Sequence, residues 1–322
     1  MPFAPAFESV HAQLVHKQSA DGVLLGGWRS TGALSHQVVA QWSRIHDGYL
    51  GPDGRPDPML YIETVRQCLP LLSHVAFGVP LENHLVWESF SCAIATDSAE
   101  AGRLLDEAEI DVWCEEVRTR GPRVTALALR FTVRHGSTVL ATAHTRFTIQ
   151  IPLVYQRLRG ERGRTSSADQ HHALPPPLPA RAVGRLMTSE VLVSATNRPR
   201  SWYLRVDTLH PVYFDHPVDH VPGALLLGAA FQAAYATVHE SGQPLQQFLP
   251  VEINGRFIHF VELGDPCEVT AQPAREAAPG RKQVEVTVQQ QGARQDAEPS
   301  FQAVVTLSRR KVPGQRMVPI RS

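Results

Sequence analysis

The stretch DHPVDHVPGALLLGAAFQAA, residues 215–234, contains a polar, turn-rich segment followed by an almost unbroken apolar run. Apolar residues would cover nearly every face of a helix here, so the pattern predicts a buried helix from Ala224 to about Val238. Gln232 interrupts the run. A buried glutamine must either satisfy neighbouring backbone groups or line a site.

A similar stretch occurs nearer the N-terminus, HDGYLGPDGRPDPMLYIETVRQC, residues 46–68. A single gap aligns the two stretches, with Pro58 opposite Gly223 and Gln67 opposite Gln232. The second apolar segment predicts another buried helix, from Met59 to about Phe77. Together the two stretches indicate an internal duplication.

Strand patterns accompany each predicted helix. The segment VTALALRFTVRHGSTVLATAHTRFTIQI, residues 124–151, contains two β-rich runs around HGS, which predicts a hairpin. The segments KQVEVTVQQQG and FQAVVTL in the second half, and GVLLGGWRS, HQVVAQWS and SWYLRVDTL before the helices, are also typical of strands. The predicted fold class is therefore α+β, a double hot-dog with two antiparallel sheets, each wrapped around a long central helix.

Residues 160–185, GERGRTSSADQHHALPPPLPARAVGR, are rich in Gly, Ser, Arg and Pro and have no apolar period. This composition predicts a linker with an extended PPPLP segment, although such a proline run can also be a ligand for another domain. The predicted organisation is an N-terminal hot-dog domain (1–159), a linker (160–185) and a C-terminal hot-dog domain (186–322).

Composition excludes several classes of protein. The 322 residues are 43% hydrophobic and 19% charged, with 31 basic and 31 acidic residues, so a core is expected and a basic nucleic-acid surface is not. No stretch reaches the length of a membrane-spanning helix, and the N-terminus lacks the pattern of a signal peptide. Four widely spaced cysteines indicate reduced thiols in a cytoplasmic protein, namely Cys68, Cys92, Cys114 and Cys267.

The chain resembles the A-factor biosynthesis family of tandem hot-dog proteins. The segments that carry this resemblance are GVLLGGWRSTG, DPMLYIETVRQ, HVAFGVPLENH, TRFTIQIPLVYQRLRG, DHPVDHVPG and GRFIHFVELGDPC, which span nearly the whole length. The resemblance implies an acyltransferase without a cofactor. It would join a β-ketoacyl group, carried as a thioester on acyl carrier protein, to the hydroxyl of dihydroxyacetone phosphate. The product would lead to γ-butyrolactone, butenolide or furan signals that control antibiotic production.

Hot-dog dehydratases place a glutamate five residues after the glycine or proline that opens the helix, and a glutamine four residues later. Glu63 and Gln67 stand at these offsets from Pro58, whereas the second half has Gly228 at the acid position. The family's second half usually reads LLLEAARQ, and this chain reads LLLGAAFQ, with Phe231 in place of arginine. The resemblance therefore implies one working acid.

Burial would raise the pKa of Glu63 and suit it to general acid or base catalysis. The alternative is a structural glutamate that pairs with Arg66. In hot-dog enzymes the loop histidine of one half faces the acid of the other, so we expect His216 or His220 at Glu63 and His46 at Gly228. The alternative for His216 is a hydrogen bond to the backbone of its turn, and Gln232 without an acid is expected to serve the core.

Gln67 and Gln232 lie four residues beyond the acid positions, where a glutamine can orient a carboxylate or line the substrate pocket. Further residues are also expected to bind substrate. The helix openings at Pro58 and Gly223 would offer N–H groups to a thioester carbonyl. Arginine suits bidentate phosphate binding, and Arg29, Arg66 and Arg256 lie in segments that match the family. Pro217 separates His216 from His220 and no third ligand follows, so we expect no metal site.

Three functions stay open from the sequence. The leading hypothesis is β-ketoacyl transfer at one site by a pseudo-dimeric monomer or a homodimer. The second is thioester hydrolysis or dehydration on the same fold, and the third is a non-catalytic ligand-binding protein. The sequence does not specify the length of the acyl chain or the acceptor.

Overall fold

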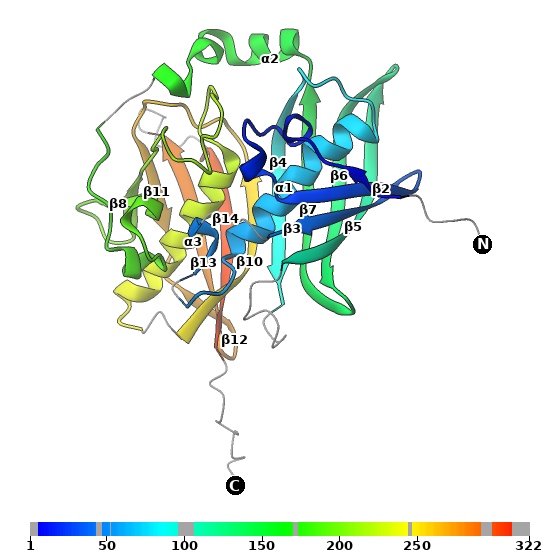
Figure 1. Ribbon diagram of the computed structural model, residues 1–322. Coiled ribbons are helices and arrows are strands. Elements are labelled where there is room, and N and C mark those ends of the chain that lie inside the picture. Colours follow the sequence, from blue (N-terminus) through cyan, green and yellow to red (C-terminus); the bar gives the residue numbers. More distant parts are fainter. Residues whose placement is uncertain are drawn as a thin grey trace.

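The computed structural model describes residues 6–42, 47–51, 53–95, 106–169, 173–243, 247–290 and 298–310 (Figure 1). Two long helices, α1 (Pro58–Val75) and α3 (Gly223–Glu240), lie side by side against one large antiparallel sheet. Both helices are buried along nearly their whole length, as their apolar sequences predicted. The buried helices confirm both helix predictions within two residues at each end.

The strands of each half curve around one of these helices (Figure 1). Inward-facing apolar residues alternate with outward-facing polar ones along the strands, so one face of the sheet packs on the helices. The first half contains β1 (Glu8–Ser9), β2 (Leu25–Gly32), β3 (Ser35–Gln41), β4 (His84–Ile94), β5 (Glu107–Arg120), β6 (Arg123–His135) and β7 (Thr138–Gln150). The second half contains β8 (Val193–Ala195), β9 (Ser201–Leu204), β10 (Phe248–Phe257), β11 (Cys267–Ala271), β12 (Arg275–Ala278), β13 (Arg281–Gln290) and β14 (Phe301–Arg309).

The two halves share one sheet. Strands β4 and β10 pair in antiparallel fashion, with Phe90 opposite Gly255, and this joins the two sheets that the sequence predicted into one. A side-chain carbon at Gly255 would lie 3.2 Å from Leu227 of α3, so glycine allows the helix to approach the sheet closely. Because β4 and β10 pair with each other, neither has a free edge that could pair with another chain. This arrangement suits a stable double hot-dog.

The segment that connects the halves carries α2 (Pro152–Arg159), which crosses the top of the molecule (Figure 1). Pro177 forms an isolated bridge with Ser194, and the Leu178 N–H donates to the Val193 carbonyl at 3.0 Å. The short 3-10 helix Ala180–Val183 then packs on α3, as Ala12–Val15 packs on α1. The other short 3-10 helices are Ala20–Gly22, Asp47–Tyr49, Gly160–Arg164, Ser167–Asp169 and Thr188–Glu190.

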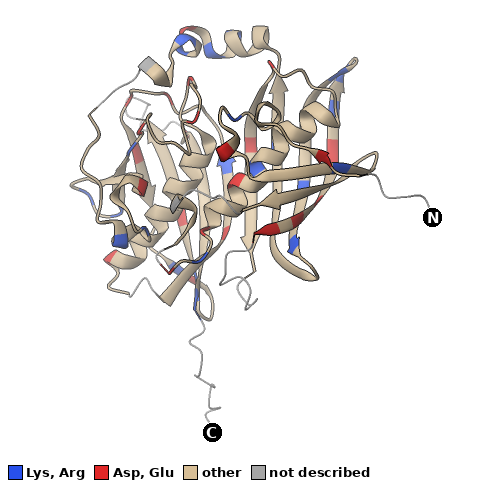
Figure 2. Cartoon of the chain, viewed as in Figure 1, with Lys and Arg blue, Asp and Glu red and all other residues tan. Residues whose placement is uncertain are grey.

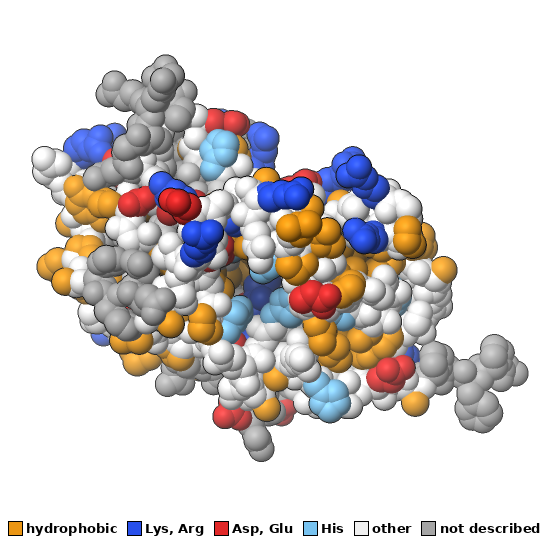
Figure 3. Space-filling model, turned by 90° about the horizontal axis from the view of Figure 1, so that it is seen from above, with side chains coloured by type: hydrophobic (Ala, Val, Ile, Leu, Met, Phe, Trp, Pro, Cys, Tyr) orange, Lys and Arg blue, Asp and Glu red, His pale blue; other side chains and the backbone are white. Residues whose placement is uncertain are grey.

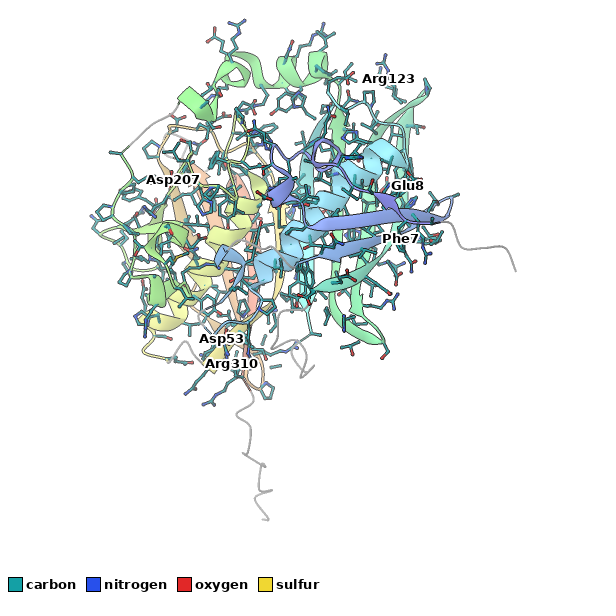
Figure 4. The ribbon with its side chains drawn as sticks, in the orientation of Figure 1. Phe7, Glu8, Asp53, Arg123, Asp207 and Arg310 are labelled. Atoms are coloured by element: carbon teal, nitrogen blue, oxygen red, sulfur yellow. The ribbon has the colours of Figure 1, made fainter. Side chains whose placement is uncertain are left out.

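Acidic and basic residues are interspersed, and no face of a single charge is visible (Figure 2). At the lower end of the molecule Asp53 pairs with Arg310, which ties the end of the last described strand to the loop before α1 (Figure 4). None of the described helices is long and apolar enough to span a membrane. All four cysteines are buried as free thiols.

Candidate active site at the junction of the two halves

The glutamines in the two helices occupy equivalent positions. The Gln67 side chain accepts a hydrogen bond from the Leu24 backbone N–H at 2.8 Å and donates to the Gly22 carbonyl at 2.8 Å. Gln232 accepts from the Leu192 N–H at 2.7 Å and donates to the Glu190 carbonyl at 2.7 Å. Each glutamine therefore fixes the start of a strand, which supports the internal duplication and the core role expected of Gln232.

Glu63 is the centre of a buried network. Its carboxylate accepts two hydrogen bonds from the Arg66 guanidinium, at 2.6 and 2.7 Å, and one from the Gln67 amide at 3.0 Å. The Lys17 ammonium lies 3.1 Å from the same carboxylate. The side chains of Glu63 and Lys17 are each 4% exposed, whereas that of Arg66 is 21% exposed. Arg66 is thus the member of this group that reaches solvent.

The network continues into the second half of the chain. Lys17 also lies 3.6 Å from Asp215, and the other Asp215 oxygen lies 2.7 Å from Nδ1 of His216. The hydrogen bond to Asp215 fixes the imidazole and leaves its Nε2 available, because the Asp215 carboxylate accepts the proton on Nδ1. The acid of one half and a histidine of the other are therefore linked through Lys17 and Asp215.

The expected rise in the pKa of Glu63 is wrong. Burial on its own would raise this pKa, but the charges of Arg66 and Lys17, with the hydrogen bonds from Arg66 and Gln67, lower it to about 2. Glu63 is therefore ionised at neutral pH, and it is a poor proton donor or acceptor there. The geometry suits a carboxylate that positions two cations.

This pKa predicts a pH dependence of stability. The ordinary pKa is 4.5 and the folded value is about 2, so the contribution of Glu63 is complete above about pH 4.5 and is lost as the pH falls towards 2. The slope of the unfolding free energy against pH reports how many more protons the unfolded state binds than the folded state. We expect Glu63→Gln to lower this difference by up to about one proton in this pH range. Urea unfolding of both proteins at several pH values measures the two slopes. Identical slopes would contradict the ionised, paired carboxylate.

The position equivalent to Glu63 in the second half is Gly228, and neighbouring side chains fill the space beside it. A side-chain carbon at Gly228 would lie 2.7 Å from the Tyr213 hydroxyl and 2.9 Å from a methyl group of Leu192. Arg185 occupies the place that Lys17 has in the first half and pairs with Asp57 at 2.7 Å. His46, which was expected to face this position, lies outside the described residues. The second half therefore retains the glutamine but leaves no room for an acid.

We expect Gly228→Ala to destabilise the protein by about 1–3 kcal/mol, because the added methyl group overpacks the space beside Tyr213. Elsewhere in a helix this change usually stabilises. Tyr213→Phe removes the closest atom, so the double variant should lose less stability than the sum of the single losses. Thermal unfolding of the three variants measures this coupling, and strict additivity would refute the contact.

His220 belongs to a neighbouring cluster. Its Nδ1 lies 2.7 Å from Asp219, which also accepts hydrogen bonds from the Tyr155 hydroxyl at 2.7 Å and from Arg159 at 2.9 Å. Arg159 further donates to both oxygens of Glu262, at 2.7 and 2.6 Å. Tyr155 and Arg159 come from α2, so this cluster ties α2 to the loop that contains both histidines.

Replacing the buried Arg159 with methionine should lower the free energy of unfolding by about 3–5 kcal/mol, because Asp219 and Glu262 lose their shared cation. Arg162→Met is a matched control. Its side chain is 58% exposed and pairs with Asp265 at 3.1 Å, so a loss below about 1 kcal/mol is expected. Urea denaturation compares the two variants, and equal losses would contradict the proposed importance of the Arg159 cluster.

Viewed from above, the molecule has a hollow between its halves, with Lys or Arg atoms at the floor and histidine side chains around it (Figure 3). The side chains of His216 and His220 are 35% and 30% exposed. His16 is partly buried and His84 is exposed, and the electrostatic influence of Arg66, His216 and His84 on the pKa of His16 places these groups in one neighbourhood. The junction of the halves thus combines cations with imidazoles.

Several residues expected at the site lie elsewhere. Arg29 contacts Gln37 at 2.6 Å and stacks over Phe7 at the far end of the first half. Arg256 lines a groove of about 520 Å³ on the face of the sheet that points away from the helices. Neither arginine contacts Glu63. The sequence alone does not show whether arginines on different strands point to the same face of the sheet.

The first residues of the two central helices, Pro58 and Gly223, already have other contacts at their positions. A side-chain carbon at Gly223 would lie 2.5 Å from the Trp87 ring, so this glycine accommodates an aromatic side chain. Pro58 has no N–H to offer, and the next N–H, of Met59, donates to Asp57 at 2.9 Å. Asp57 is engaged in turn by Arg185. These contacts give both positions a packing or capping role.

Four members of these clusters were not predicted from the sequence, namely Lys17, Asp215, Tyr155 and Arg159. One signal for Lys17 lies in the repeat, because QLVHKQSADGVLL and RAVGRLMTSEVLV, residues 13–25 and 181–193, place a cation at the same position. Asp215 and Asp219 each directly precede a histidine, which is a weak signal for an aspartate–histidine pair. The contacts of α2 have no comparable signal in the sequence.

Comparison with known proteins places this geometry in a family. The sequence model described as the A-factor biosynthesis hotdog domain matches residues 2–150 and 166–307. The chain belongs to the A-factor biosynthesis hotdog family. The resemblance of the sequence to this family is therefore confirmed, and so is the double hot-dog fold.

Two Streptomyces proteins are similar to this chain over most of their length. A protein from Streptomyces virginiae, named 2-oxo-3-(phosphooxy)propyl 3-oxoalkanoate synthase, is 39% identical over 279 residues, which cover 87% of this chain and 92% of that protein. A protein of the same name from Streptomyces coelicolor is 32% identical over 283 residues, 87% of each chain. A crystal structure of a protein from Lactobacillus plantarum, described as an oleoyl thioesterase, has a TM-score of 0.51 at 13% identity and covers 88% of this chain and 99% of that one. This last likeness concerns the fold alone.

Proposed function

We propose that the protein is an acyltransferase that joins a β-ketoacyl group from a thioester to the hydroxyl of dihydroxyacetone phosphate. The printed name of the relatives, 2-oxo-3-(phosphooxy)propyl 3-oxoalkanoate synthase, describes the product of this reaction. The single observation that carries the proposal to this chain is the ion-pair series Glu63–Lys17–Asp215–His216, which joins the two halves. Such a series is suited to orient a base beside fixed cations.

His216 is the proposed base. The acceptor hydroxyl oxygen attacks the thioester carbonyl carbon while its proton moves to Nε2 of His216, which Asp215 orients through Nδ1. The tetrahedral intermediate then collapses, the carbon–sulfur bond breaks, and His216 returns the proton to the sulfur. The products are the ester and the free thiol, so protons and electrons balance without a cofactor.

Arg66 is the proposed electrostatic partner. Its guanidinium is fixed by two hydrogen bonds to Glu63 and keeps a fifth of its side chain exposed, so it can face negative charge in the hollow. A fixed cation near a developing oxyanion lowers the barrier because it needs no reorganisation during the reaction. The same charge would attract the phosphate of the acceptor. Glu63 and Lys17 act through Arg66 and Asp215 as positioning residues.

The donor is proposed to arrive on acyl carrier protein in the cytoplasm, where four buried thiols would remain reduced. The reaction is tested by incubating the purified protein with a β-ketoacyl thioester, with and without dihydroxyacetone phosphate, and analysing the products by mass spectrometry. Ester that forms only with the acceptor is the expected result. Free acid without acceptor would instead identify hydrolysis, and an enoyl product would identify dehydration of a 3-hydroxyacyl donor.

A further inference from the structure

His16 has an unusual backbone conformation. It follows the 3-10 helix Ala12–Val15 with φ 53° and ψ 47°, which is the left-handed region. The equivalent residue in the second half is Gly184, with φ 70°, and both positions are followed by the same turn hydrogen bond, from Lys17 to Ala12 at 2.9 Å and from Arg185 to Ala180 at 2.8 Å. Histidine tolerates this region better than most residues but glycine is its usual occupant.

The imidazole of His16 is fixed by a second histidine. Nδ1 of His74 lies 2.7 Å from the Val79 carbonyl oxygen, which can only accept, so His74 donates there. The other nitrogen of a neutral His74 then accepts a hydrogen bond from Nε2 of His16, at 2.9 Å. This assignment leaves a lone pair on Nδ1 of His16, which makes no further hydrogen bond with the described residues.

The His16 imidazole stays neutral in this position. Burial is the main cause that lowers its pKa, to about 3, and the nearby His74, Arg66, His216 and His84 lower it further. Its neighbour in the chain, Lys17, contacts Glu63, so His16 stands beside the proposed catalytic network. His16 therefore provides an oriented hydrogen-bond acceptor beside this network, and the proposed mechanism does not use it.

The chemistry of the two substrates limits what this lone pair can bind. The acceptor's hydroxyl proton goes to His216 in the proposed reaction, and its ketone and phosphate oxygens accept hydrogen bonds. The β-ketoacyl chain has no N–H or O–H group beside its thioester. The remaining donors near the sulfur are the amide N–H groups of the pantetheine arm that carries the acyl thioester.

We propose that Nδ1 of His16 accepts a hydrogen bond from a pantetheine amide N–H and so aligns the thioester in the hollow. The inference rests on the proposed acyl transfer. With this role, His16 would be a substrate-binding residue that distinguishes thioesters with a pantetheine amide from thioesters without one. The role also explains why a histidine occupies a left-handed position that Gly184 occupies in the second half.

The test compares two donors and two variants. One donor is the β-ketoacyl thioester of N-acetylcysteamine, which has an amide N–H, and the other is the matching propyl thioester, which has none. His16→Gly should lower kcat/KM for the amide donor about tenfold, the effect of one lost hydrogen bond, and leave the propyl donor unchanged within about twofold. His16→Asn, which also tolerates the left-handed region, serves as the second variant.

Folding does not confound this test, because glycine fits the conformation and the Tm of His16→Gly should not fall. Equal losses for both donors, or no loss for either, would overturn the inference. If the unmodified protein forms no ester, the proposed function fails, and the inference is still tested by binding. The thioether analogues of both donors are then titrated by calorimetry, and the variant must lose affinity for the amide analogue alone.

Discussion

Replacing His216 with alanine is expected to lower kcat for ester formation by about a hundredfold to ten-thousandfold, the usual contribution of a general base. The reason is geometric, because His216 is held by Asp215, and Asp215 lies beside the Lys17 that pairs with Glu63. The KM values should change little, since the imidazole takes the proton in the transition state rather than holding the substrate in the ground state. Steady-state kinetics with both substrates measures the effect.

His220→Ala is the matched control for this variant. It has the same aspartate–histidine arrangement, and its exposure is similar, but its aspartate is held by Tyr155 and Arg159 of α2. We therefore expect kcat to fall less than about tenfold. A larger loss for His220→Ala than for His216→Ala would exchange the roles of the two histidines and contradict the assignment.

The second large effect is expected at Glu63. Glu63→Ala should lower the free energy of unfolding by about 3–5 kcal/mol, because it leaves Lys17 and Arg66 without their shared carboxylate. The loss follows from burial, since the side chains of Glu63 and Lys17 are each 4% exposed. Urea denaturation at neutral pH measures it, with circular dichroism to verify the fold.

A charge-balanced pair of substitutions separates this loss from the removal of atoms. Glu63→Gln alone leaves an excess positive charge, whereas Glu63→Gln with Lys17→Met removes one charge of each sign. The double variant should recover at least half of the stability that Glu63→Gln loses, because the pair is coupled. Additive losses would show that Lys17 and Glu63 do not stabilise each other.

The local features of the fold were accessible from the sequence. The apolar runs around Gln67 and Gln232 identified both central helices, and the spacing of three residues on one helix brought Glu63 and Arg66 together as the alternative interpretation required. The predicted hairpin corresponds to β6 and β7, which pair along their lengths. Each of these inferences depends on residues close in the chain.

The remainder depends on contacts between distant segments. Lys17 stands 46 positions before Glu63, and its charge adds to that of Arg66 in lowering the pKa of Glu63. His216 and His220 each follow an aspartate in the sequence, yet Lys17 lies beside one aspartate–histidine pair and α2 beside the other. Nothing in the composition of residues 152–159 indicated that α2 would bury Arg159. Such partners are set by tertiary packing, which periodicity does not report.

We propose that one site at the junction of the halves binds both substrates. The most direct measurement is a crystal structure of the protein with a non-transferable thioether analogue of the β-ketoacyl donor and dihydroxyacetone phosphate. We expect the acceptor hydroxyl to lie within hydrogen-bond reach of Nε2 of His216 and the analogue's carbonyl to face Arg66. Ligands bound instead in the outer groove beside Arg256, or beside Tyr213 in the second half, would contradict it.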